Sequence, residues 1–297
     1  MIKFEEIVNE KNKEKRDTLI KRKLEELNNN SDDSIIKTRS IVNGFINKNS
    51  IVHFSDYLYD PTIGLGYFYY VNSEDYFYEF FDFLSKKNIN NKSTALRALS
   101  SFIKRYLGET NGKNNDRDKV FLNKCRELDA AYHSLPTEEY YKQVNEFFSI
   151  GSFKGKSYAE CTEHAVLAQN LLTICDINSF YVTGAMNYIS GMSDHAFNIF
   201  ELDGIYCLFD PTNPIQFYDS NYKLLGFTSL VKEIPIEEMK EFINCEKYID
   251  VVSCNYKVEK NKQLVPIDYD NYRYYITGRI KNKEALDNFF HQDNISL

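Results

Sequence analysis

Tryptophan is absent from this sequence of 297 residues, whereas tyrosine occurs 23 times and phenylalanine 22 times. Tyr and Phe must therefore fill every position that needs a wide aromatic ring. A net positive charge is also missing, because the formal charge is −7 at pH 7. No positive field attracts phosphate groups, so we expect no nucleic-acid partner.

Long apolar runs are missing as well, since no window approaches the ~18 apolar residues that a membrane span requires. We therefore expect no membrane partner. The first ten residues lack the basic region and apolar stretch of a secretory signal. The six cysteines follow no small-scaffold spacing, which indicates free thiols in a reducing cytoplasm. Export without a cleaved signal is the alternative.

Helical patterns dominate the first half of the chain. A charged amphipathic helix is expected over residues 1–28, and the Asn-, Ser- and Asp-rich run that follows it is a linker candidate. Apolar spacing predicts a second helix over Ser34–Asn47. The segment Ser93–Leu107 has a clear helical period, and Gly108 suits its C-terminal end.

The pattern changes after Gly155, where a helix is expected over Glu160–Ile174 and short strands follow. Asp203 and Gly204 form a strong hairpin signal, because Gly accepts the positive φ of a tight turn. The three expected strands are Ser179–Ala185, His195–Leu202 and Gly204–Phe209.

This order of elements predicts an α+β protein in three parts. Residues 1–33 form the N-terminal helix and linker, residues 34–150 a mainly helical lobe, and residues 151–297 a core. In that core one helix would pack on an antiparallel sheet.

Three residues of the core combine a thiol, a base and a carboxylate. Cys161 is expected in the first turn of a helix, where the helix dipole favours negative charge. Pairing about the Asp203-Gly204 turn would place His195 opposite Thr212, within reach of Asp210. Such a carboxylate can orient an imidazole that activates a thiol, so the spacing predicts a Cys161–His195–Asp210 triad.

These segments resemble the transglutaminase-like superfamily, within the wider papain-like fold. The helix that begins at Cys161 is similar to the family's nucleophile helix, and His195-Ala196-Phe197-Asn198 is similar to its His strand. Leu208-Phe209-Asp210-Pro211-Thr212 matches its hydrophobic-Asp-Pro-Thr motif. The resemblance covers roughly 60 residues and implies that residues 151–297 are a transglutaminase-like catalytic core. It also implies that Cys161 is the nucleophile, His195 the base and Asp210 its orienting group.

The expected activity is attack of Cys161 on a peptide or glutamine-side-chain amide through a thioester. Water as acceptor gives a protease or deamidase, and an amine acceptor gives a transglutaminase. We rank hydrolysis ahead of amine transfer, with a protein or peptide as substrate. A non-catalytic protein-binding module on the same fold is the alternative from another class.

The surroundings of the triad are less well defined by the sequence. The backbone amide of Cys161 is the default oxyanion donor, and a second donor near Tyr158 is a hypothesis. Cys161 and His164 have the spacing of a zinc pair, but the sequence offers no second tight pair. No Asp-rich calcium loop is visible either. We therefore expect no metal and no cofactor.

Overall fold

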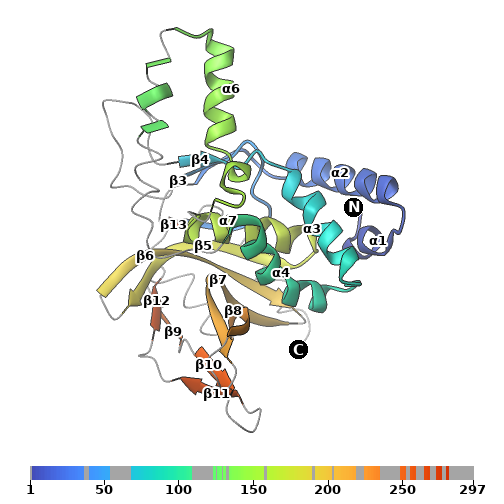
Figure 1. The fold of residues 1–297 in the computed structure, drawn as a ribbon, viewed down its shortest axis with the longest axis vertical. Helices are drawn as coiled ribbons and strands as arrows, with labels where there is room; N and C mark the ends of the chain where they lie inside the picture. Colours follow the sequence, from blue (N-terminus) through green and yellow to red (C-terminus); the bar gives the residue numbers. More distant parts are fainter. Residues whose placement is uncertain are drawn as a thin grey trace.

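The fold was described from a computed structural model (Figure 1). It describes residues 2–36, 40–53, 68–108, 123–124, 126–128, 130–131, 134–156, 159–188, 191–202, 204–218, 224–234, 248–251, 255–258, 264–267, 272–275 and 279–280. Helices and a largely antiparallel sheet are both present, which confirms the expected α+β class. Among the described residues, no helix combines the length and the apolar character of a membrane span.

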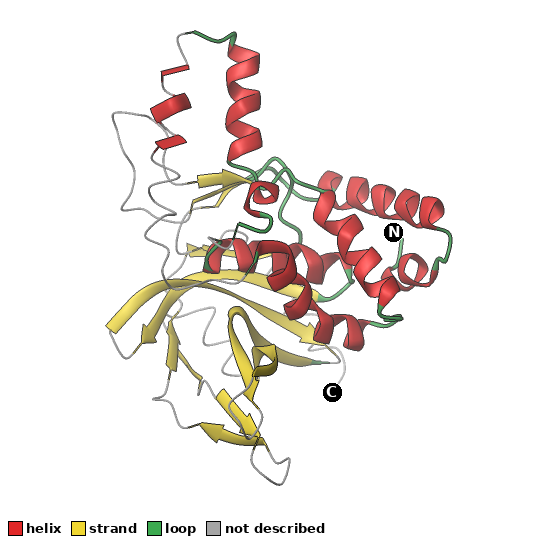
Figure 2. Ribbon diagram, in the orientation of Figure 1, coloured by secondary structure: helices red, strands yellow, loops and turns green. Residues whose placement is uncertain are grey.

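The helices gather on one side of the molecule and most strands on the other (Figure 2). The α-helices are α1 (Phe4–Asn9), α2 (Lys13–Asn29), α3 (Asp75–Lys86), α4 (Lys92–Leu107), α6 (Thr137–Phe147) and α7 (Cys161–Ile174). A short 3-10 helix, η1 (Ile150–Phe153), precedes α7. The helix expected to end at Gly108 is α4, and that glycine has a φ of 87°.

Among the described residues, the strands form a small three-stranded sheet and a larger ten-stranded one. The small sheet contains β1 (Ile35–Ile36), β3 (Ile51–His53) and β4 (Phe68–Tyr70). The centre of the larger sheet is the antiparallel run β5 (Asn178–Tyr188), β6 (Gly191–Leu202), β7 (Ile205–Tyr218) and β8 (Leu224–Ile234). Its other strands are β2 (Ser40–Asn43), β9 (Tyr248–Val251), β10 (Asn255–Val258), β11 (Leu264–Ile267), β12 (Tyr272–Tyr275) and β13 (Arg279–Ile280).

The N-terminal segment is a pair of helices rather than the single helix expected over residues 1–28. The chain leaves helical geometry at Glu10, and α2 begins after Asn12. The side-chain oxygen of Asn12 accepts a hydrogen bond from the amide of Lys15 at 3.1 Å. A capping side chain of this kind satisfies an amide that would otherwise lack an acceptor, and it favours a new helix start.

The prediction of a helix over Ser34–Asn47 is wrong. This segment instead supplies β1, which pairs with β3, and β2, which pairs with β5. Its Ile and Val residues are β-branched and fit a pleated strand well, so their spacing alone does not exclude strands. Gly44 follows β2 with a φ of 74°. The N-terminal region is therefore less helical than expected.

The boundaries at residues 33 and 150 stay predictions, but two features of the structure cross them. The strand β2 belongs to the same sheet as β5, β6 and β7. The buried apolar side chains also form one cluster whose members run from Ile2 to Phe209. The N-terminal helices therefore share a core with the sheet.

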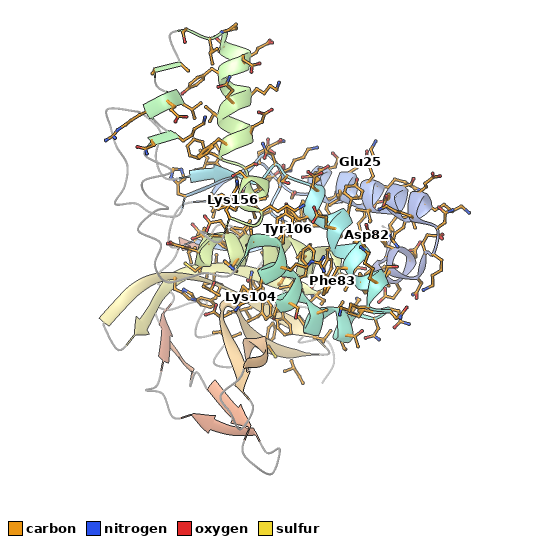
Figure 3. All side chains as sticks on the ribbon, in the orientation of Figure 1. Glu25, Asp82, Phe83, Lys104, Tyr106 and Lys156 are labelled. Carbon is orange, nitrogen blue, oxygen red and sulfur yellow. The ribbon has the colours of Figure 1, made fainter. Side chains whose placement is uncertain are left out.

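Ion pairs and aromatic contacts hold the helices α2, α3 and α4 together on one side of this core. Asp82 of α3 forms ion pairs with Lys13 and Arg16 of α2. Phe83 of α3 and Tyr106 of α4 are both labelled in Figure 3. Their ring centroids lie 5.7 and 5.9 Å from that of Phe102 on α4. These contacts join α2, α3 and α4.

A buried lysine connects the N-terminal helices to the end of α7. Lys23 of α2 is fully buried, and its Nζ lies 2.6 Å from Oδ1 of Asp176. The other carboxylate oxygen of Asp176 accepts a hydrogen bond from the amide of Phe4 at 2.7 Å. Asp176 has a φ of 55°, in the left-handed region that often ends a helix. One carboxylate therefore anchors both α1 and α2 beside the C-terminus of α7.

Helix α7 packs on β5, β6 and β7, and it is buried around almost its whole circumference (Figure 1). Its buried residues include the apolar Ala165, Ala168, Leu171 and Leu172, but also the polar Gln169 and Asn170. An apolar period predicts only one buried face. The polar side chains can be buried because each has hydrogen-bond partners.

Gln169 makes the most extensive of these contacts. Its amide nitrogen donates to the carbonyl oxygens of Gly44 and Ser179, at 2.7 and 2.9 Å. Its amide oxygen accepts a hydrogen bond from Asn198 of β6 at 3.2 Å. Asn198 also donates to the carbonyl oxygen of Ala165, at 2.9 Å. These bonds join α7 to β5, to β6 and to the turn after β2.

Replacement of Gln169 by Leu is expected to lower the free energy of unfolding by about 2–4 kcal/mol, because buried carbonyl and amide groups lose their partners. Urea unfolding followed by far-UV circular dichroism measures this loss. The matched control is Gln143→Leu on α6, where the half-buried side chain hydrogen-bonds to Glu139 of the same helix. We expect that variant to stay within about 0.5 kcal/mol of the wild type. Equal stability of the two variants would contradict this role of Gln169.

Candidate active site

Cys161 is the first residue of α7, as expected from the sequence. The preceding Glu160 has an extended backbone, and its amide donates to the carboxylate of Glu163 at 2.8 Å. This bond is one half of a capping box, which explains why the helix starts at this point. Cys161 is partly exposed, whereas the next eleven residues of the helix are buried. The thiol therefore lies where the helix meets the solvent.

His195 lies on β6 and is buried, with an exposed fraction of 3%. The expected hairpin is confirmed, since Asn198 pairs with Phe209 and Leu202 pairs with Ile205. This register places residue 195 opposite residue 212, just beyond the paired part of β6 and β7. The ring of Phe197 stacks on that of His195, with a centroid distance of 6.3 Å and an interplanar angle of 19°. The register and the stacking together hold the imidazole in place.

Asp210 is fully buried on β7, and its two oxygens have separate roles. Oδ2 lies 2.7 Å from Nε2 of His195. Oδ1 accepts a hydrogen bond from the amide of Thr212 at 2.9 Å. The second contact is an Asx-turn across Pro211, and such turns are common at Asp-Pro. The turn fixes the carboxylate in the orientation that meets the imidazole.

Cys161 lies next to the imidazole ring of His195, and its side chain hydrogen-bonds to that ring. Nε2 of His195 is occupied by Asp210, so Nδ1 is the nitrogen left to face the thiol. The structure therefore brings Cys161, His195 and Asp210 together in one chain of hydrogen bonds. The order along it is thiol, imidazole, carboxylate.

The charge of Asp210 decides the protonation state of His195. Burial by itself lowers the pKa of this imidazole, but the charge and hydrogen bond of Asp210 and the contact with Cys161 outweigh it. The pKa of His195 is raised to about 10. The imidazole is therefore an imidazolium at neutral pH, and a neighbouring imidazolium favours the thiolate form of a cysteine.

The other candidate residues are placed differently. Tyr158 lies outside the described residues. His164 is buried, and its Nδ1 donates to the carbonyl oxygen of Glu160 at 2.6 Å. Burial lowers the pKa of His164, so it is neutral. Among the described side chains, no group of three or more His, Cys, Asp or Glu is arranged to hold a metal ion.

Gln169 and Asn198 are the supporting residues that the sequence reasoning missed. Both are polar residues within apolar runs, Ala-Gln-Asn-Leu on α7 and Phe-Asn-Ile on β6. A polar side chain at a buried position needs a partner, so this break in the pattern was an available signal. Only the structure shows that the two are partners of each other.

Comparison with known proteins adds no relative, since no family model, curated protein or solved structure matches this chain. The function of the site therefore rests on its own contacts and charges. These are a partly exposed thiol, a buried imidazole and a buried carboxylate. The arrangement can present the sulfur of Cys161 to an electrophile from solvent, and His195 can hold a proton next to it.

We expect Cys161 to react with iodoacetamide at mildly acidic pH at least about tenfold faster than the other five cysteines, because its thiol contacts the imidazolium of His195. Peptide mass spectrometry over a time course measures the rate at each cysteine. The variant His195→Gln should lose this advantage. The matched control is Cys207→Ser, which removes another partly exposed thiol and should leave the rate at Cys161 unchanged. Uniform slow labelling would rule out the ion pair.

The stability of the protein should also depend on the protonation of His195. Its pKa is about 10 in the folded state against an ordinary value of 6.5, so folding favours the bound proton. This contribution is fully present below pH 6.5 and is lost as the pH rises through about 10. Urea unfolding at a series of pH values measures this contribution. The free energy of unfolding of the wild type should exceed that of the double variant His195→Gln/Asp210→Asn by an amount that shrinks as the pH rises. A difference that stays constant over this range would contradict the raised pKa.

Proposed function

We propose that this protein is a cysteine enzyme that attacks an amide carbonyl and forms a thioester at Cys161. The observation that carries the proposal is the hydrogen-bonded chain from the Cys161 thiol through His195 to Asp210. The motifs around these three residues resemble those of the transglutaminase-like superfamily. A papain-like core, with α7 as nucleophile helix on the sheet, belongs to the same proposal.

Acylation would start from the thiolate and the imidazolium. The sulfur of Cys161 attacks the carbonyl carbon, and the carbonyl π electrons move to oxygen to form a tetrahedral oxyanion. When the intermediate collapses, the C–N bond breaks and the leaving nitrogen takes the proton from Nδ1 of His195. The products are an amine or ammonia and a thioester with a neutral His195.

Deacylation would use the same residues in reverse. Neutral His195 takes a proton from water, the oxygen attacks the thioester carbonyl, and the C–S bond breaks to restore the thiolate. Asp210 stays ionised and stabilises the imidazolium in each half of the cycle. An amine in place of water gives a new amide. We rank hydrolysis of a peptide or glutamine amide ahead of this transfer.

The contrast with a second cysteine supports the assignment of the nucleophile. Cys175 is fully buried at the end of α7, and burial raises its pKa. A thiol with a raised pKa stays protonated and is a poor nucleophile. Cys161 combines access from solvent with a cationic partner, while His195 and Asp210 are protected from water. Buried charges of this kind interact more strongly than exposed ones.

We expect a library of glutamine-containing peptides to be modified by the protein, because the partly exposed thiol of Cys161 contacts the imidazolium of His195. Mass spectrometry separates three outcomes: cleavage, the small mass gain of deamidation, and an adduct when a primary amine is added. Deamidation or cleavage without added amine is the expected result. The activity should be lost in Cys161→Ala and reduced by about 10⁴-fold or more in His195→Gln.

The control for this experiment is Cys207→Ser, which should retain full activity. Circular dichroism must show that each variant is folded, so that loss of activity is not loss of structure. Activity that persists in Cys161→Ala would contradict the proposed nucleophile. No modification of any peptide, together with unselective alkylation of Cys161, would favour the non-catalytic binding module.

A further inference from the structure

A tyrosine on β5 lies near the start of α7, and its hydroxyl group is buried. Tyr181 of β5 is fully buried. Its hydroxyl is shielded from solvent and has no hydrogen-bond partner among the described residues. Buried hydroxyl groups are nearly always paired, because an unpaired one costs stability. An exception next to a candidate active site therefore calls for a functional explanation.

The sheet register places Tyr181 beside the first half of α7. Tyr181 pairs directly with Asn198, and the side chain of Asn198 donates to the carbonyl oxygen of Ala165 on α7. Residues that pair directly across antiparallel strands project to the same face of the sheet. Tyr181 therefore projects from the face on which α7 lies.

A second contact gives the direction of the helix relative to the strand. Ser179, two residues before Tyr181, hydrogen-bonds to Gln169, which lies four residues after Ala165. Two residues of strand span about 6.6 Å, which equals about four residues of helix. The helix and the strand therefore run in opposite directions. The long side chain of Tyr181 starts at the level of Ala165 and can reach the first turn.

The electrostatic surroundings agree with this placement. Burial raises the pKa of the Tyr181 hydroxyl well above its ordinary value, and the charges of Cys161 and Glu163 raise it further. Both of these residues are in the first turn of α7. The phenol is therefore neutral at any physiological pH, and its proton is available for donation.

The first turn also presents backbone donors at the same place. The first amides of an α-helix have no acceptor within the helix, and here they include those of Cys161 and Thr162. The first bond within the helix runs from the amide of His164 to the carbonyl oxygen of Glu160. A carbonyl carbon that bonds to the partly exposed Cys161 sulfur would bring its oxygen to this end of the helix.

We propose that the hydroxyl of Tyr181 is the second oxyanion donor, which hydrogen-bonds to the tetrahedral oxygen formed when Cys161 attacks a carbonyl. This inference rests on the proposed function, and it replaces the hypothesis of a donor near Tyr158. In the described structure the hydroxyl has no partner at rest, because its partner, the oxyanion, exists only during the reaction. A donor held ready in a water-excluded site is the arrangement that stabilises an oxyanion most.

Two reactions of the same thiol test the proposal. Iodoacetamide alkylates a thiolate by displacement and forms no oxyanion, whereas p-nitrophenyl acetate acylates it through a tetrahedral oxyanion. We expect Tyr181→Phe to be alkylated at Cys161 at the wild-type rate. Its acylation, followed by the burst of nitrophenolate, should be slower by about 100-fold. Because the lost hydroxyl has no partner, the melting temperature should be equal to or above that of the wild type.

The matched control is Tyr106→Phe on α4, another buried tyrosine, whose hydroxyl hydrogen-bonds to Ser73. We expect it to lose stability and to keep both rates. Wild-type acylation of Tyr181→Phe, or equal slowing of both reactions, would overturn the role of Tyr181. A lower melting temperature of Tyr181→Phe would also overturn it, because the hydroxyl would then have a partner at rest. If the wild type is neither alkylated nor acylated at Cys161, the proposed function fails as well.

Discussion

The hydrogen bonds that hold α7 on the sheet are the constraint on which the rest of the site depends. Cys161 is on the helix, while His195 and Asp210 are on two strands, so their contact requires a fixed helix position. Gln169 and Asn198 fix this position through hydrogen bonds of their side-chain amides, whose geometry allows little shift of the helix along the sheet. Apolar packing alone is less directional, since contact between Leu and Ala side chains changes little over small shifts.

The buried charges of the site form a second connected system. Asp210 is fully buried, and its attraction to the positive His195 offsets the free-energy cost of removing the carboxylate from water. The Asx-turn to Thr212 keeps the carboxylate oriented in both the neutral and the protonated state of His195. The same Asp-Pro-Thr segment is therefore both a turn and part of the site.

Much of the candidate site could be predicted because its signals are local. The start of α7 follows from Glu160 and Glu163, and the hairpin register follows from the Asp203-Gly204 turn. The segment 34–47 was predicted wrongly for a physical reason. Adjacent Ile and Val residues suit a strand and a buried helix equally. The hydrogen-bonded ladder between β2 and β5 decides for the strand. Gln169 was missed because its partners are distant in the sequence.

By itself the sequence determined which chemical groups are present and which neighbours share a helix turn or a hairpin. Those interactions involve residues close along the chain, where backbone geometry leaves few arrangements. The tertiary structure alone decided that the thiol meets the imidazole, that His195 is charged, and that the Tyr181 hydroxyl has no hydrogen-bond partner within the described part of the chain. Burial and long-range contact set all three, because a pKa and an unmet hydrogen bond depend on everything that surrounds a group.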